Sequence, residues 1–114
     1  MLSREEIQQL ARAIVDEMES RYSAELAPKW EGGSVFLLPG KEGLKEYEIP
    51  IDRLLHKIVL IRENLRILEQ KINNHEKLSD ADKVKLQAYI TRCYGSLTTF
   101  NVLFYHDEDK FKSS

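Results

Sequence analysis

The sequence predicts a mainly α-helical fold, a three-helix antiparallel bundle-like domain with a small β-hairpin inserted between the first and second helices. Three observations predict it. Apolar residues recur at alternating spacings of four and three in two long stretches, and a third helical stretch opens the chain. A segment rich in glycine, proline and apolar residues separates the opening helical stretch from the two long ones. At 114 residues the chain fits a single domain with one core.

The first helix is expected over about residues 3–27. Ser3 followed by Glu6 forms a capping box, and Pro28 ends the helical pattern. Acidic residues outnumber basic ones on its polar faces, whereas basic residues outnumber acidic ones in the second helix. Opposite charges therefore favour packing of the first helix beside the second. Its apolar series is Ile7, Leu10, Ile14, Met18, Tyr22 and Leu26.

A β-hairpin is expected over about residues 34–49. Apolar or alternating residues at 34–38 and 45–49 predict two short strands, and Pro39 and Gly40 break the chain after the first. A lone two-stranded hairpin is marginally stable in water. The hairpin must therefore lie against the helices or pair with another chain.

The second and third helices are expected over about residues 51–74 and 79–105, packed as an antiparallel pair. Asp52 is the predicted cap of the second helix, and Ser79 with Asp82 begins the third. Residues 106–114 are expected to form a short polar tail. The two heptad series are Leu54, Ile58, Ile61, Leu65, Leu68 and Ile72, and then Leu86, Ile90, Cys93, Leu97, Phe100 and Phe104.

Two small residues in the third helix carry separate predictions. Gly95 lies inside the helix, where glycine costs about 1 kcal/mol relative to alanine, so a close neighbour is expected there. Cys93 is the single cysteine and falls on the apolar series, which predicts a buried, unreactive thiol in a reducing compartment. The chain start lacks an apolar secretion signal and no stretch is long enough to span a membrane, so a cytoplasmic location is expected.

Residues 93–106 contain no Asp, Glu, Lys or Arg, although they cover nearly four helical turns. A helix without a charged stripe is expected to be enclosed on most sides. We therefore predict a homodimer that acts as a non-enzymatic interaction or adaptor module. The alternative cover for this segment is the hairpin of a monomer. The predicted interface residues are Val35, Phe36, Leu37 and Tyr47 of the hairpin, and Phe100, Phe104 and Tyr105 of the third helix.

No catalytic, cofactor-binding or metal-binding pattern is present in the sequence. Asp52 and His56 share a helical face, but a metal site needs a third and a fourth ligand. The glycines at 32, 33 and 40 lack the Lys-Ser/Thr context of a phosphate loop and are typical of turns. Enzyme activity, a cofactor and a resident metal are therefore not expected.

Two other functions remain open. Arg53, Lys57, Arg62 and Arg66 could form a basic face for nucleic acid or an acidic partner, although the net charge of −2 favours neither nucleic acid nor an anionic membrane. A small-ligand sensor or enzyme with a pocket around Tyr89, Cys93 and Tyr94 is the further alternative.

Overall fold

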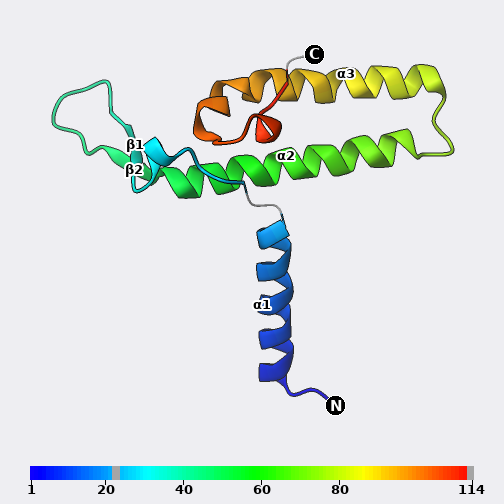
Figure 1. Ribbon diagram of the computed structural model, residues 1–114, viewed down its shortest axis with the longest axis horizontal. Coiled ribbons are helices and arrows are strands. Elements are labelled where there is room, and N and C mark those ends of the chain that lie inside the picture. The colour runs from blue at the N-terminus through cyan, green and yellow to red at the C-terminus, as the bar shows by residue number, and fades with distance from the viewer. Residues whose placement is uncertain (22–23, 113–114) are drawn as a thin grey trace.

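The protein is mainly helical, with three helices and a two-stranded antiparallel hairpin between the first two, as predicted (Figure 1). The computed structural model describes the backbone of residues 1–21 and 24–112, and the side chains of residues 1–14 and 24–112. The helices are α1 (Arg4–Arg21), α2 (Ile51–Asn73) and α3 (Asp80–Leu97), and the strands are β1 (Ser34–Leu37) and β2 (Tyr47–Pro50). Short 3-10 helices are η1 (Pro28–Trp30), η2 (Thr98–Leu103) and η3 (Asp107–Asp109).

Helices α2 and α3 form an antiparallel hairpin (Figure 1), and the sequence predicts a side-chain cap at the start of each. The Ser79 hydroxyl accepts a hydrogen bond from the backbone N–H of Asp82 at 3.1 Å, so the predicted start of the third helix is confirmed. The predicted cap of the second helix is wrong. Pro50 occupies the capping position, and Asp52 lies in the first turn, where its carboxylate accepts the Arg53 N–H at 2.9 Å.

The interior stripe of α2 differs from the apolar series that the sequence suggested. Buried and half-buried positions recur at spacings of four and three through Ile51, Leu55, Ile58, Arg62, Leu65, Glu69 and Ile72. The predicted members Ile61 and Leu68 each lie one position before an interior residue, and each is 47% exposed. Two polar residues therefore occupy interior positions that an apolar pattern cannot reveal.

The core lies at the end of the helical hairpin away from its turn, where the chain after α3 folds back on α2 (Figure 1). The Phe111 side chain is only 6% exposed and meets the Phe104 ring at 5.9 Å between centroids. Its backbone exchanges two hydrogen bonds with the Asn101 side chain, at 2.7 and 3.0 Å. The prediction of a polar tail from residue 106 is therefore wrong, because Phe111 anchors that segment. The buried core residues are Ile51, Leu55, Ile58, Val59, Leu103, Phe104 and Phe111.

The third helix is shorter than predicted. The α-helix α3 ends at Leu97, and the chain continues as the 3-10 helix η2. The Thr98 hydroxyl donates to the Gly95 carbonyl at 2.7 Å, beside this change of pitch. Among the described residues, a Cβ added at Gly95 would meet no atom within 4 Å. In this part of the chain the predicted close neighbour of Gly95 is therefore not found.

The segment before the β-hairpin pairs with the end of η2 rather than extending the first helix. Leu26 and Phe104 form an isolated antiparallel bridge, in which the Ala27 N–H donates to the Leu103 carbonyl at 2.8 Å. The Trp30 indole N–H donates to the Val102 carbonyl at 2.8 Å. The predicted helix over residues 3–27 is therefore too long at its end, because the backbone groups of Glu25 and Ala27 bind Tyr105 and Leu103 instead, and α1 is described up to Arg21.

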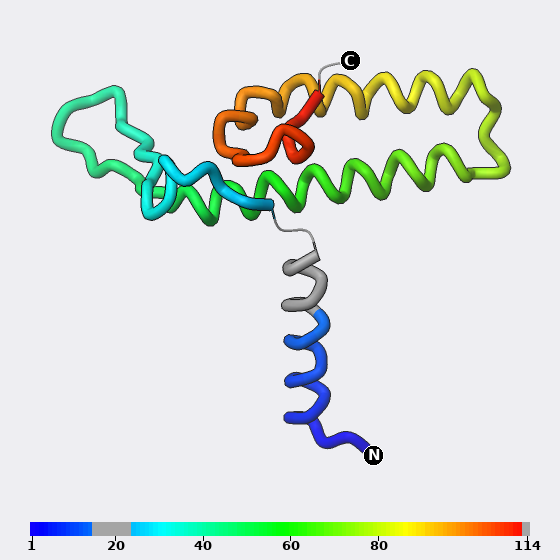
Figure 2. Tube along the Cα trace, in the orientation of Figure 1, coloured from blue at the N-terminus to red at the C-terminus, as the bar shows by residue number. Residues whose placement is uncertain are grey.

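Helix α1 projects away from α2 and α3 (Figures 1 and 2). Its capping box is confirmed, with the Glu6 N–H donating to the Ser3 hydroxyl at 3.1 Å. Its Ile7, Leu10 and Ile14 side chains are 54%, 52% and 51% exposed. Met18 and Tyr22, predicted members of the same series, lie outside the described side chains.

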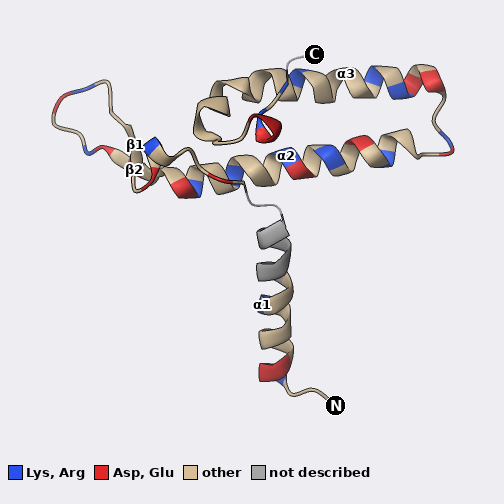
Figure 3. Cartoon of the chain, viewed as in Figure 1, with Lys and Arg blue, Asp and Glu red and all other residues tan. Residues whose placement is uncertain are grey.

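The predicted packing of the first helix beside the second is therefore wrong. Figure 3 shows charged residues of both signs along α2. Two of its basic residues, Arg62 and Arg66, are paired with Glu63 of the same helix, and Arg62 also reaches Asp109. Because α2 and the C-terminal segment supply these acidic partners, α1 is not needed to neutralise Arg62 and Arg66.

Candidate interaction surfaces

The predicted interface residues of the third helix do not form one surface. Phe104 is 3% exposed and lies in the core of its own chain, so it cannot contribute to an exposed surface. Phe100 is half-buried against the same core. Tyr105 is 51% exposed and lies beside the His106 ring, with 4.9 Å between centroids.

The predicted interface residues of the β-hairpin are mostly exposed. Phe36, Leu37 and Tyr47 are 48%, 56% and 63% exposed, whereas Val35 is half-buried against the core. Leu37 and Tyr47 face each other in the strand register. The β-hairpin extends beyond the start of α2 (Figure 1), and the exposed pair Leu37 and Tyr47 lies at the end of the strands away from α2.

The base of the hairpin is tied closely to α2. The Ile51 N–H donates to the Gly33 carbonyl at 3.0 Å, and a Cβ at Gly33 would come within 3.0 Å of the Ile51 side chain. A larger residue at position 33 would therefore require a small shift of the Ile51 side chain or the Trp30 carbonyl. The contact fixes where the exposed strands lie relative to the helices.

A second exposed apolar surface, here called the open side, runs along the helical hairpin. It consists of Ile61, Leu68, Leu86, Tyr89 and Cys93. Their exposed fractions are 47%, 47%, 38% and 64% for the first four, and Cys93 is also exposed. In an antiparallel pair these helical positions flank the interior stripes of both helices on the same side. All of them except Tyr89 belong to the heptad series of the sequence. Because Cys93 is exposed, the predicted buried thiol is wrong.

The opposite side of the helical hairpin formed by α2 and α3, here called the closed side, carries the C-terminal segment. Val59 lies only two residues before Ile61, which places it about 160° around the helix axis. It is 1% exposed and belongs to the cluster with Leu103 and Phe104. One side of the helical pair is therefore covered by the chain, and the other carries exposed apolar groups.

Arg62 joins the C-terminal segment to the closed side. Its guanidinium donates to Glu63 at 2.9 Å and to the Asp109 carbonyl at 2.8 Å, and it stacks on Phe104 at 5.7 Å. With 4% exposure, Arg62 is an internal residue. The predicted basic face of Arg53, Lys57, Arg62 and Arg66 thus loses one member to the interior, while Arg66 donates to Glu63 at 2.9 Å.

The residues of the predicted pocket are not brought together. Tyr89 and Cys93 lie on the open side, whereas Tyr94 lies against the closed side, where its hydroxyl donates to Glu69. Burial raises the pKa of the Tyr94 hydroxyl, and the Glu69 carboxylate raises it further. A hollow of about 340 Å³ beside this pair is bordered by Arg66, Thr91 and Phe111 among others.

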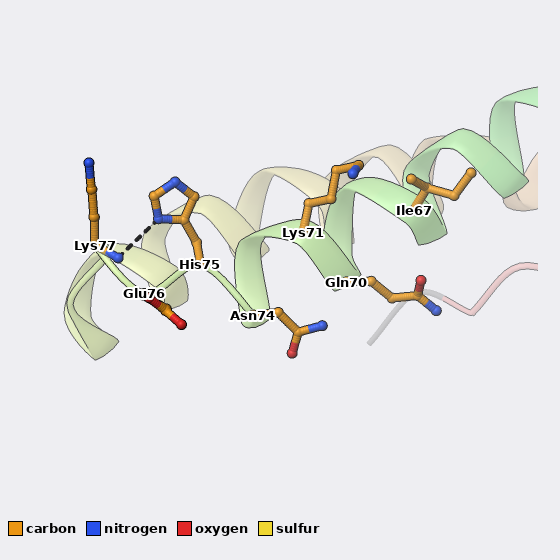
Figure 4. A pocket seen from close by; sticks show the side chains of 7 residues that line it. All are labelled: Ile67, Gln70, Lys71, Asn74, His75, Glu76 and Lys77. Carbon is orange, nitrogen blue, oxygen red and sulfur yellow. Dashed lines mark hydrogen bonds between the residues drawn. The ribbon is translucent and has the colours of Figure 1, made fainter.

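A shallow hollow of about 740 Å³ lies where α2 meets the turn (Figure 4). Figure 4 shows Lys71, His75 and Lys77 to one side of this stretch, and Asn74 and Glu76 to the other. The His75 Nδ1 accepts the Lys77 N–H at 3.1 Å. The His75 ring therefore satisfies a backbone N–H in the turn between α2 and α3.

One exposed ion pair holds the segment that follows α1. The Glu25 carboxylate lies 2.8 Å from His106 Nε2, and the Tyr105 N–H donates to the Glu25 carbonyl at 3.0 Å. The hydrogen bond to Glu25 raises the pKa of His106 above its ordinary value. Residues 25–27 are thereby attached to residues 103–106 through both backbone and side chain.

Within the described residues, no three His, Cys, Asp or Glu side chains are grouped in a way that could hold a metal ion. The described helices also include none that is long and apolar enough to cross a membrane.

The chain was compared with protein families, curated proteins and solved structures. Residues 20–110 match the family described as Domain of unknown function (DUF8685). No curated protein and no solved structure matches the chain. The matched span contains both strands, α2, α3 and the segment up to η3, and it leaves most of α1 outside. Since the match covers well over half of the sequence, the chain belongs to the DUF8685 family.

Proposed function

We propose that this protein is a non-enzymatic interaction module that works as a homodimer through the open side of α2 and α3. The observation that carries the proposal is the exposure of Ile61, Leu68, Leu86 and Tyr89 on one side of a two-helix hairpin. Contiguous exposed apolar surface on a soluble domain is typical of an interaction site. The heptad spacing of three of these residues is also the pattern by which helices pack on other helices.

A second copy is the partner that the proposal names. Two-fold dimers are the commonest soluble oligomers, and a two-fold axis buries the same surface on both chains. In such a dimer the open sides of both copies are covered together. The β-hairpin stays free at the far end, with Leu37 and Tyr47 exposed, which suits an adaptor that binds a further protein there.

The mass in solution tests the proposal. The unmodified protein should elute from size exclusion with a light-scattering mass near 26.6 kDa, twice the 13.3 kDa of one chain. Ile61→Lys should shift the mass to that of one chain, because an unpaired charge would have to be buried in the interface. A single-chain mass for the unmodified protein at high micromolar concentration would contradict the proposal.

Two control variants separate the open side from other exposed apolar positions. Val84 is 69% exposed on α3, but it lies two residues before Leu86, which places it about 160° around the helix axis from the open side. Val84→Lys should therefore leave the dimer mass unchanged. Leu37→Lys in the β-hairpin should also leave the dimer mass unchanged. A single-chain mass for Leu37→Lys would instead place the dimer interface on the β-hairpin.

A further inference from the structure

We infer that the open side of each copy is covered by α1 of the other copy. The inference rests on the proposed homodimer and names the segment that makes the contact. Helix α1 carries a second apolar face in the same chain, formed by Ile7, Leu10 and Ile14, each slightly more than half exposed. Spacings of three and four place these residues on one helical face. The chain thus contains two exposed apolar helical surfaces of the kind that pack on one another.

The dimensions of the two surfaces agree. The 18 residues of α1 make a helix about 27 Å long. On α2 the stretch from Lys57 to Lys71, which contains Ile61 and Leu68, is about 21 Å long. One α1 helix can therefore lie along the whole open side, in the seam between α2 and α3, as a third helix does in a bundle.

The charges at the borders also agree. Lys57 and Lys71 are exposed and flank Ile61 and Leu68 on α2. Residues 4–21 contain three arginines and five acidic residues, so α1 carries a net charge of −2, and its first turn contains Glu5 and Glu6. An acidic helix beside a basic border gives electrostatic complementarity.

The connection after α1 favours the other copy over the same chain. Glu25 and Ala27 are hydrogen-bonded to Tyr105 and Leu103, next to the core residue Phe104, which packs with Val59. Val59 is on the closed side, about 160° around α2 from Ile61. Only residues 22–24 separate α1 from this attachment. To reach the open side of the same chain, α1 would have to pass around α2 within the length of these three residues. A second copy has no such restriction, and reciprocal exchange makes two equal contacts about one two-fold axis.

Disulfide trapping tests which chain supplies the helix. Cys93 lies on the open side and is the single cysteine of the chain. Leu10→Cys and, separately, Ile14→Cys add a thiol to the apolar face of α1. Mild oxidation should give a 26.6 kDa species on a non-reducing gel, and peptide mass analysis should show the new thiol joined to Cys93 of a different chain. Arg12→Cys is the control, because Arg12 is about 160° around α1 from Leu10 and its thiol should remain unlinked.

Two trapping results would overturn the inference. A disulfide between the new thiol and Cys93 within one 13.3 kDa chain would show that α1 folds onto its own hairpin. A disulfide that joins the Cys93 residues of two chains would show that the two open sides face each other directly.

Point variants in the full chain then separate this inference from the homodimer itself. Leu10→Lys should give a single-chain mass by light scattering, whereas Arg12→Ala should keep the dimer. A dimer that survives Leu10→Lys but is lost in Ile61→Lys overturns the role of α1 and leaves the homodimer standing. A single-chain mass for the unmodified protein overturns both.

Discussion

Replacing Phe111 with alanine tests whether the C-terminal segment belongs to the core. The Phe111 side chain is 6% exposed, and its ring lies 5.9 Å from that of Phe104 and 6.2 Å from that of Tyr94. Loss of a buried phenylalanine side chain costs about 3–5 kcal/mol of unfolding free energy. The two hydrogen bonds with Asn101 involve only backbone atoms of residue 111, so they remain available to alanine. The expected loss therefore reports side-chain packing.

Urea unfolding followed by far-UV circular dichroism measures this loss. Phe36→Ala is the matched control, because the Phe36 side chain is 48% exposed in the β-hairpin. It should cost about 1 kcal/mol or less, since only part of the ring is removed from water. If Phe111→Ala cost no more than Phe36→Ala, the C-terminal segment would not be part of the core.

Two further predictions concern helix α3 and the segment that follows α1. Gly95→Ala should raise the unfolding free energy by about 1 kcal/mol, because a Cβ there meets no atom within 4 Å, and a decrease in urea unfolding would contradict this. The pKa of His106, followed by NMR titration, should lie above the ordinary value of about 6.5 and fall toward it in Glu25→Gln. The Glu25–His106 pair should therefore add stability below about pH 6.5 and lose this contribution as the pH rises through the raised pKa, so an unchanged His106 titration in Glu25→Gln would contradict its role.

Most parts of the fold that depend on neighbouring residues could be predicted from the sequence, with the Asp52 cap as the exception. Ser3 with Glu6 and Ser79 with Asp82 form caps within one helical turn, and both caps are present. The two short strands also follow from local pattern. The fold class was confirmed for the same reason, since long periodic stretches determine which elements form.

The parts that depend on distant residues could not be predicted. Arg62 occupies an interior position because Asp109 and Phe104 meet it there, and neither lies near it in the sequence. Phe111 is an isolated apolar residue in a polar stretch, too short a signal for a periodic pattern. Gly95 suggested a close neighbour because glycine is costly in a helix, yet the space around it is open.

The candidate surfaces also divide into features that follow from local sequence and features that depend on distant residues. Of the predicted interface residues of the β-hairpin, Phe36, Leu37 and Tyr47 are exposed and Val35 is half-buried, and their role in an interface stays a prediction. Phe104 was assigned to an interface because its segment lacks charge, but the segment before the β-hairpin and Phe111 bury it within the chain. The open side was hidden inside the heptad series, because periodicity shows which face of a helix is apolar but not what covers that face.

The reactivity of Cys93 gives the most direct measurement of the central claim, that the open side is buried between two copies. The unmodified protein would be diluted in steps, and the rate at which a thiol reagent labels Cys93 would be measured at each concentration. Because only an accessible thiol reacts, labelling should be slow at high protein concentration and should accelerate as dilution separates the dimer. A labelling rate that is fast and independent of protein concentration would contradict the claim.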